Sequence, residues 1–385
     1  ALEKYGVLLG GDQLTRVRLD GAKDLRYLSP TPEKRFDHLK PIVCELWHLK
    51  QDSLEKLYKT FYKKESAGSE GTLSHLKNVL HHNDVNGKVK YNFRAHSQFI
   101  KLVFSELEFE QSREVLNLLI NLPPNNIKRA KRSTKVLHKE NITETILKLF
   151  YFGVEEDTDD ELFNYMCQLC QWALHFIALD DTASEGDISR VLPNLRQCIP
   201  YFFSHSKLSK YLVECSNYIV KCETSSPLTR MRILVGSFVN RRGGIGQNVE
   251  ADLIHEHSVR HQKELIRELG ANKTERAISR STNASNLVEE IISSFDLSLG
   301  IPGKGAHHGK NASEEEVLKL RSIIQGIRPF RKTPGRKCTS FHFKCPYFKA
   351  NKEKLKETLT VLLRRLNVGS HISCDDNDED DDSDA

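Results

Sequence analysis

The first 64 residues alternate short apolar runs with amphipathic stretches, an order that predicts a strand, a helix, a second strand and a second helix. Residues 5–10 form an apolar run bounded by glycine, residues 41–47 form another, and residues 49–64 carry apolar side chains at helical spacing. Thr31 followed by Pro32 predicts the start of the intervening helix. Two strands joined in this way are expected to be parallel neighbours in one sheet. The chain is therefore expected to begin with an α/β region.

Acidic residues and a histidine lie where the two predicted strands end. Asp12 follows the first run directly, and Glu45 and His48 lie at the end of the second. Because the carboxyl ends of parallel strands meet at one edge of a sheet, we expect these three side chains to lie close together.

A helix predicted in the last third of the chain brings further acids to one face. Asp252, Glu256, Arg260 and Lys263 recur there at spacings of three and four residues. Two Mg²⁺ or Mn²⁺ ions about 3.5 to 4 Å apart cleave phosphodiesters when converging carboxylates hold both ions. Asp12, an acid of the neighbouring strand and an acid of this helix would meet that requirement. The alternative is that the helical acids are solvated partners in salt bridges.

The remainder of the chain is predicted to be mostly helical, and its composition divides it into regions. The helical insertion is expected to separate the first α/β region from the helices that carry Glu256. The predicted regions are an α/β region (1–68), a helical insertion (69–230), returning helices (231–300), a basic and aromatic region (301–370) and a disordered acidic tail (371–385).

The charge distribution predicts a polyanion as partner. The formal net charge is +5, although the last twelve residues contain eight acids and no base, so the rest of the chain is more basic still. No apolar run is long enough to cross a membrane, and no secretory signal is present, so a membrane partner is not expected. The chain begins with Ala1, which suggests that an upstream region is missing.

Three basic clusters are the candidates for contact with nucleic acid. Basic side chains would neutralise phosphates, and the aromatic residues of the last cluster could stack on bases. The alternative for that cluster is that its aromatic residues form a small core. The candidate cations are Lys128, Arg129, Lys131, Arg132, Arg241, Arg242, Arg331, Lys332, Arg336 and Lys337. The first cluster also suits nuclear import, so a nuclear location is expected, or otherwise a cytoplasmic one.

The nine cysteines are scattered and odd in number, which argues against a disulfide framework. Cys167 and Cys170 fall within a helical apolar pattern and are expected in the core. Cys338, His342 and Cys345 are more plausible metal ligands, but no fourth ligand is evident. Zinc is therefore not expected.

Several strings resemble the signature of domain-of-unknown-function family 6589. They are LGGDQLT at residues 9–15, the Trp47-His48 pair, DLIHEH at residues 252–257, Arg260 and LGANKT at residues 269–274. The resemblance covers about residues 4 to 300.

The order of motifs in that family looks like that of cut-and-paste transposases. The resemblance implies an α/β fold with a ribonuclease-H-like mixed sheet interrupted by a large all-α insertion. It also implies that Asp12 is the first catalytic acid, Glu256 the last, and His48 the histidine beside the second. Here the sequence departs from the pattern, because Leu46 stands directly before Trp47 where an acid is expected. The middle carboxylate then comes from Glu45 or is absent.

The resulting prediction is a transposase-derived DNA-binding protein that, if active, is a metal-dependent nuclease or strand transferase. Asp12, Glu45, Asp252 and Glu256 would hold Mg²⁺ or Mn²⁺, and His48 would orient a carboxylate or phosphate. The alternative is an inactive copy that acts as an interaction scaffold. No small-molecule substrate is expected, and association into homo-oligomers is compatible with either prediction.

Overall fold

The computed structural model describes residues 6–120, 159–205, 209–241, 243–300 and 312–368. These residues divide into two compact units. Unit 1 comprises the described parts of residues 1–45, 195–237 and 350–385, and unit 2 comprises those of residues 46–194 and 238–349. The acidic tail and the cluster at Lys128, Arg129, Lys131 and Arg132 lie outside the described residues, as does Arg242.

Unit 1 contains the predicted pair of strands. β1 (Val7–Gly11) pairs in parallel with β2 (Leu39–Cys44), with Gly11 opposite Cys44, so their carboxyl ends share an edge. The connection is α2 (Gln13–Leu25), which begins far earlier than the helix predicted from Thr31. Residues 31–38 form turns instead, in which the Thr31 hydroxyl accepts a hydrogen bond from the amide of Lys34. The parallel pairing was predicted correctly, whereas the position of the helix was wrong.

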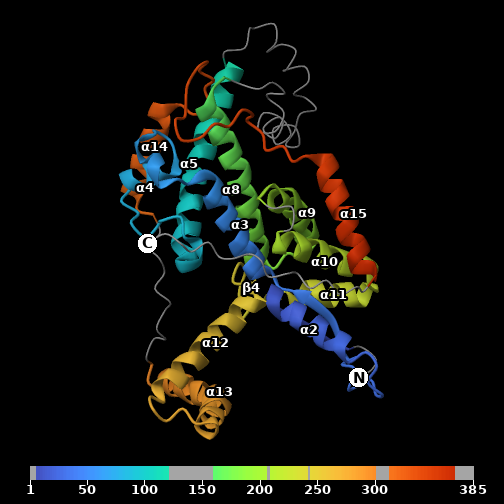
Figure 1. The fold of residues 1–385 in the computed structure, drawn as a ribbon. Coiled ribbons are helices and arrows are strands. Elements are labelled where there is room, and N and C mark those ends of the chain that lie inside the picture. The colour runs from blue at the N-terminus through green and yellow to red at the C-terminus, as the bar shows by residue number, and fades with distance from the viewer. Residues whose placement is uncertain (1–5, 121–158, 206–208, 242, 301–311, 369–385) are drawn as a thin grey trace, which may run out of the picture. The chain divides into compact units, whose positions relative to one another are not determined.

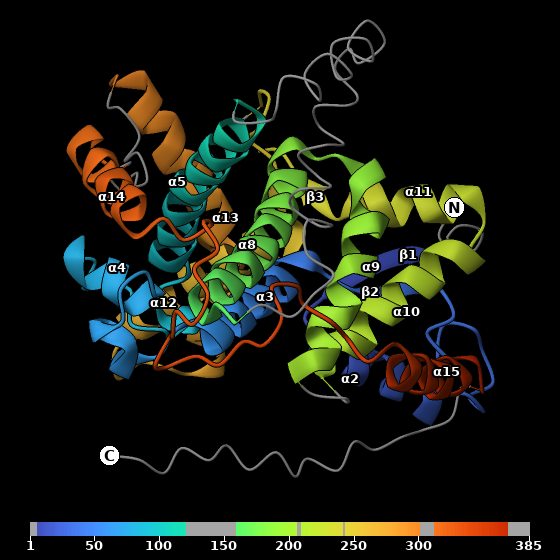
Figure 2. The same cartoon turned by 90° about the horizontal axis from the view of Figure 1, so that it is seen from above.

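Four helical segments accompany this pair of strands in unit 1. They are the part of α9 (Ile188–His205) from Leu195 onward, α10 (Lys210–Thr224), α11 (Pro227–Gly236) and α15 (Lys352–Val368). α10 packs against β2 and α15, as Figure 2 shows. Arg16 of α2 holds α10 through two hydrogen bonds of 2.5 and 2.6 Å to the buried carboxylate of Glu214.

The predicted ribonuclease-H-like mixed sheet is wrong. The described residues form two sheets of two strands each, namely β1 with β2, and the antiparallel pair β3 (Phe238–Val239) and β4 (Val249–Glu250). The physical reason lies in what covers β2. Its buried residues Ile42, Val43 and Cys44 are covered by helices such as α10, and the apolar patterns that follow have helical period. The α/β pattern of the first 64 residues therefore corresponds to a single pair of parallel strands, β1 and β2.

Unit 2 is helical apart from β3 and β4. α3 (Leu46–Phe61), α5 (Phe93–Ile120) and α8 (Glu161–Glu185) pack alongside one another, and α14 (Glu314–Ile327) packs on α5 (Figure 1). Its core includes Leu54, Phe61, Phe99, Tyr165 and Phe176, each fully or almost fully buried. In chain order its elements are α3 (Leu46–Phe61), η1 (Lys64–Gly68), α4 (Leu73–Val79), η2 (Val89–Tyr91), α5 (Phe93–Ile120), α8 (Glu161–Glu185), the start of α9, β3, β4, α12 (Ala251–Glu268), α13 (Glu275–Ser298) and α14 (Glu314–Ile327).

The aromatic residues of the basic stretch after α14 belong to the core of unit 2. Phe343 stacks on Phe61 of α3 at 5.5 Å between ring centroids, and Phe341 lies 4.8 Å from the ring of Tyr165 of α8. Phe348 makes an edge contact with Trp172. These rings therefore follow the core alternative and not the base-stacking one.

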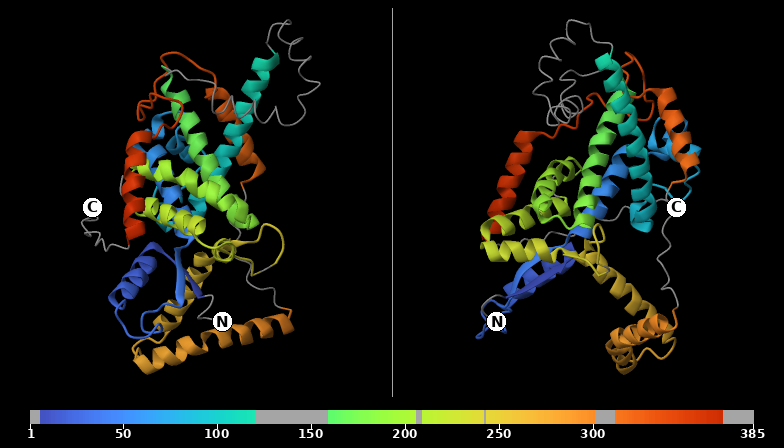
Figure 3. Two further views of the ribbon diagram at one scale, coloured as in Figure 1. Left: turned by 90° about the vertical axis from the view of Figure 1, so that its right-hand side faces the viewer. Right: turned by 180° about the vertical axis from the view of Figure 1, so that it is seen from behind.

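α12 and α13 form a helical hairpin in unit 2, which is visible in both views of Figure 3. α12 ends before Gly270, whose φ of +56° lies in the left-handed region that favours glycine. Thr274 begins α13, because its hydroxyl accepts a hydrogen bond from the amide of Ala277. Across the part of the chain that the structure describes, no helix has the length and apolar character needed to span a bilayer.

Candidate functional site

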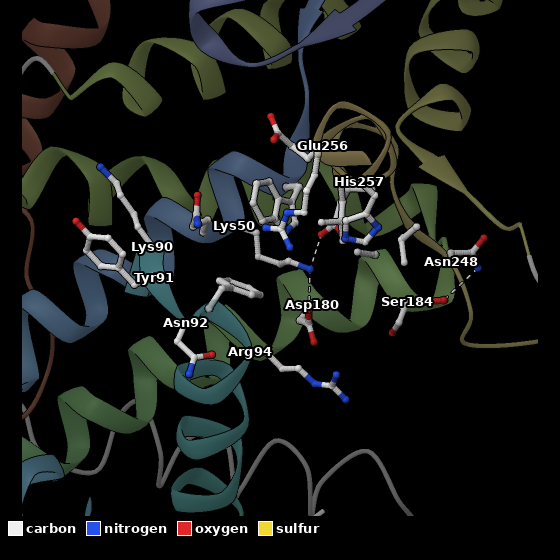
Figure 4. Close-up of a pocket in the computed structure, with 18 residues that line it drawn as sticks. Lys50, Lys90, Tyr91, Asn92, Arg94, Asp180, Ser184, Asn248, Glu256 and His257 are labelled. Atoms are coloured by element: carbon white, nitrogen blue, oxygen red, sulfur yellow. Dashed lines mark hydrogen bonds and ion pairs between the residues drawn. The ribbon is translucent and has the colours of Figure 1, made fainter. Parts of the chain in front are cut away.

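A hollow of about 640 Å³ opens in unit 2 where four segments meet (Figure 4). They are the first turns of α3, the start of α5, the carboxyl end of α8, and the junction of β4 with α12. Its lining consists of Trp47, Lys50, Gln51, Lys90, Tyr91, Asn92, Phe93, Arg94, Asp180, Ala183, Ser184, Asn248, Val249, Glu250, Leu253, Glu256, His257 and Arg260.

The carboxylate of Asp252 holds the first turn of α3 beside this hollow. It accepts hydrogen bonds from the backbone amides of Trp47, at 3.0 Å, and His48, at 3.2 Å. The first amides of a helix have no partner within the helix, so an acceptor must come from elsewhere. Asp252 is almost fully buried and supplies that acceptor from the first turn of α12. It thereby ties the start of α12 to the start of α3.

The same carboxylate orients the imidazole of His48. Nδ1 of His48 lies 3.0 Å from Oδ2 of Asp252, and Nε2 lies 3.8 Å from Oε1 of Glu256. A carboxylate can only accept, so Nδ1 donates to Asp252 and Nε2 is directed toward Glu256. An imidazole held in this way can accept or deliver a proton at Nε2. The structure thus brings together three of the predicted residues.

A buried ion cluster forms the floor of the hollow. Nζ of Lys50 lies 2.7 Å from Oδ1 of Asp180 and 2.5 Å from Oε1 of Glu250, and Lys101 also pairs with Asp180. Burial alone would lower the pKa of Lys50, but the charges of Glu250 and Asp180 outweigh it, so that pKa is raised. Lys50 therefore stays charged in the floor of the hollow.

The two carboxylates of this cluster shift in opposite directions. Burial raises the pKa of Glu250 despite the nearby ammonium group of Lys50. Burial would also raise the pKa of Asp180, but two lysines surround it, and the net effect is a lowered pKa. Asp180 is thus the more firmly ionised partner of Lys50.

The rim of the hollow is basic and aromatic. Lys90 and Tyr91 at the end of η2 and Arg94 at the start of α5 are exposed, and Arg260 of α12 is exposed as well. Tyr91 keeps 83% of its surface exposed. An aromatic ring so exposed, flanked by cations, can stack on a planar group from outside the chain. Sequence reasoning missed this rim, although Lys90, Tyr91 and Arg94 are a short basic and aromatic signal.

Asp12 and Glu45 lie in unit 1, at the shared edge predicted for them. The amide of Glu45 donates to the carbonyl of Gly11, and the Glu45 side chain lies over Gly10, where an added Cβ would come within 1.5 Å of Oε1. Asp12 is the N-cap of α2 and accepts a hydrogen bond from the amide of Thr15 at 2.7 Å. His48, expected at the same edge, belongs to unit 2.

The predicted metal set draws on both units, and its convergence stays a prediction. Within the described residues, no group of three or more His, Cys, Asp or Glu side chains is placed to hold a metal ion. In unit 2, Asp252 gives its oxygens to three N–H groups of Trp47 and His48, which fits a positioning role better than that of a metal ligand.

Three cysteines lie in surroundings that raise the pKa of their thiols. Burial raises the pKa of Cys167 to about 12 and that of Cys170 well above its usual range. Burial likewise raises the pKa of Cys338. A metal ligand must be a thiolate, so raised pKa values favour packing roles for these side chains.

The predicted nucleic-acid residues of unit 2 differ in their surroundings. Arg331, Lys332 and Lys337 are exposed, as is Arg241. Arg336 is half-buried, lies 2.7 Å from the buried carboxylate of Asp160, and also donates to four backbone carbonyls. Arg336 therefore anchors the stretch after α14 to the start of α8.

Comparison with known protein families places this chain. The family described as "Family of unknown function (DUF6589)" matches residues 1–308. No curated protein and no solved structure matches the chain. The likeness to transposases stays a prediction. The matched residues are well over half of the 385, and include every element of the hollow and of the β1–β2 edge, so the chain belongs to this family of unknown function.

Proposed function

We propose that this protein binds nucleic acid, and DNA in particular, through the hollow of unit 2. The observation that carries the proposal is the rim, where Lys90, Arg94 and Arg260 line the hollow together with the exposed ring of Tyr91. Cations at such a rim neutralise phosphates, and the ring offers a stacking surface to an unpaired base.

The acids of the hollow do not cancel this charge. Asp180 and Glu250 are matched by Lys50 and Lys101, so the floor contributes little net charge. Glu256 is half-exposed and lies 3.8 Å from Nε2 of His48 through its Oε1. A nucleic-acid strand bound along the rim would thus contact the cations there and lie above the ion-paired floor of the hollow.

Binding of labelled DNA over a salt series tests this proposal. Lys90→Glu with Arg94→Glu should weaken binding and flatten the dependence of log K on log salt, because phosphate contacts release bound counterions. The matched control is Lys352→Glu with Lys356→Glu on α15, which makes the same change in net charge at exposed positions of unit 1. Equal weakening by the two pairs would leave only a general charge effect and would refute binding at the hollow.

The ring of Tyr91 is tested separately. Tyr91→Ala should weaken binding of single-stranded DNA by about 5- to 150-fold, the equivalent of about 1 to 3 kcal/mol for one stacked base. Tyr91→Phe keeps the ring and should bind like the wild type. Loss of binding in both variants would point to the hydroxyl group and contradict a stacking role.

A second candidate function is cleavage of phosphodiesters, which the positions of His48, Asp252 and Glu256 favour. Asp252 would orient the imidazole of His48, and His48 would carry a proton at Nε2. The resemblance would add Asp12 and Glu45 as acids. A nicking assay with Mg²⁺ or Mn²⁺ compares the wild type with Asp12→Ala, His48→Gln and Glu256→Gln. Equal background cleavage by all four proteins would remove the enzyme proposal and leave the binding protein.

A further inference from the structure

α13 exposes an apolar stripe along its carboxyl half. Five large apolar side chains, which recur at spacings of one, three and four residues, are each between 47% and 61% exposed. They are Leu287, Val288, Ile291, Ile292 and Phe295. On a helix these positions form one continuous face. Contiguous apolar surface of this kind on a folded protein marks an interaction site.

One face of α13 already has a partner. Ile278, Thr282 and Asp296 are half-buried and Ser285 is buried, and at helical period these four residues share one face. α13 packs against α12 in the hairpin (Figure 3), which accounts for that face. The apolar stripe lies beside it, and Leu287 and Ile291 lie farthest from it around the helix.

The charges of α13 are divided between its two halves. In the amino half Arg276 and Arg280 outnumber the single acid Glu275, whereas the charged residues of the carboxyl half, such as Glu290, are all acidic. A second α13 laid antiparallel would place basic residues against acidic ones at both ends, and a parallel one would place like charges together. Antiparallel helices also oppose their dipoles favourably. The charge pattern therefore selects a second, antiparallel copy of the same helix.

The shape of the amino half suits the same partner. A shallow hollow on α13 is lined by Arg276, Ser279, Arg280, Asn283 and Ala284. Its side chains are small or flexible, whereas those of the carboxyl half are bulky. In an antiparallel pair the bulky half of each helix lies over the open half of the other, as interdigitated packing requires.

We propose that two copies of this protein associate through antiparallel pairing of their α13 helices. The partner is a second copy of the chain, and the apolar stripe together with the hollow on the amino half forms the interface. This association is independent of the proposed binding of nucleic acid.

The full chain is suited to a direct test by sedimentation velocity and light scattering. The wild type should be a dimer, and Ile291→Gln with Phe295→Gln should weaken dimerisation by about 100-fold or more, because both side chains lose their buried apolar contact. The matched control is Leu318→Gln with Met231→Gln, which alters two exposed apolar residues of α14 and α11. The control pair should remain dimeric.

Charge exchange tests the antiparallel arrangement. Arg276→Glu with Arg280→Glu should weaken the dimer, and the further change Glu290→Arg should restore part of the lost affinity. Restoration shows that the opposite halves meet, because a folding defect would not be repaired by further substitutions. A monomeric wild type overturns the proposal, even if α13 then binds a lipid vesicle or another segment of the chain. A dimer that survives Ile291→Gln with Phe295→Gln overturns it as well.

Discussion

α2 and α3 begin in the same way along the chain and are held in opposite ways. Each starts one residue after a strand of the parallel pair, so Asp12 precedes α2 and Glu45 precedes α3. Asp12 caps its own helix by accepting from the amide of Thr15, three residues away. The first amides of α3 are instead bound by Asp252, 204 residues beyond His48. The same need for an acceptor is met locally in one case and across the fold in the other.

The difference shows which contacts organise unit 2. A local cap stabilises its own helix wherever that helix lies. A distant cap stabilises α3 only when α12 is correctly packed, so it links the two helices in one cooperative unit. The cluster of Lys50, Asp180 and Glu250 adds a second link of this kind one turn further along α3. We therefore expect substitutions in distant contacts to cost more than the loss of a local cap.

The largest effect is expected for Lys50→Met. Removal of the ammonium group leaves Glu250 buried without this cation and should destabilise unit 2 by about 3 to 5 kcal/mol. The measurement is the free energy of unfolding in urea. Lys50→Met with Glu250→Gln should recover part of the loss, because no buried charge is then stranded at Glu250.

A surface pair supplies the control for this experiment. Lys59 lies 3.0 Å from Glu55 on α3 and is well exposed, so Lys59→Met should change stability by less than about 0.5 kcal/mol. Similar losses for Lys50→Met and Lys59→Met would contradict the special role of the buried cluster.

Asp252→Ala is expected to come next, at about 2 to 4 kcal/mol, because it removes the acceptor of three N–H groups of Trp47 and His48. Asp252→Asn keeps one acceptor oxygen and should cost less. Amide hydrogen exchange should show faster exchange at Trp47 and His48 than at the interior of α3. Unchanged protection of these two amides would show that Asp252 does not cap α3.

Asp180→Asn is expected to cost about 1.5 to 3 kcal/mol near neutral pH, since charged hydrogen bonds to Lys50 and Lys101 are lost. Burial works to raise the pKa of Asp180, but the two lysines prevail and lower it below its usual value of 3.8. The advantage of the wild type should thus be complete above that value and should shrink as the pH falls through the lowered pKa. Urea unfolding of both proteins between neutral and acidic pH measures this change. A difference in the free energy of unfolding that grows on acidification would contradict the prediction.

Among the substitutions of caps and buried partners, Asp12→Ala should have the smallest effect, about 1 kcal/mol, as expected for a local helix cap. Asp12→Ser keeps a capping oxygen and should remain close to the wild type. Thermal unfolding monitored for unit 1 provides the comparison. A loss as large as that of Asp252→Ala would erase the distinction between local and distant caps.

Part of the candidate site could be predicted from the sequence. The shared strand edge of Asp12 and Glu45 followed from the order of apolar runs, and the single face of Asp252 and Glu256 followed from helical spacing. The contact of His48 with Asp252 was not predictable from spacing, because it depends on how α3 and α12 pack. Lys50 and Glu250 carry no pattern that distinguishes them from surface residues.

The extent of the sheet could not be predicted from the sequence either. The alternation of apolar runs predicted parallel strands correctly, but the resemblance extended them to a larger mixed sheet, which the residues described by the structure do not form. Phe341 and Phe343 were equally open to stacking on bases or to packing in a core, and contacts with Phe61 and Tyr165 placed them in the core.

The amino-acid sequence by itself determined the parallel strand pair and most of the helical stretches, because the order and period of apolar residues can be followed along the chain. Only the tertiary structure decided which carboxylates meet His48 and Lys50, and which aromatic rings are buried. These choices depend on the packing of helices that lie far apart along the chain, where many acids are chemically equivalent and position alone separates a buried partner from a solvated one.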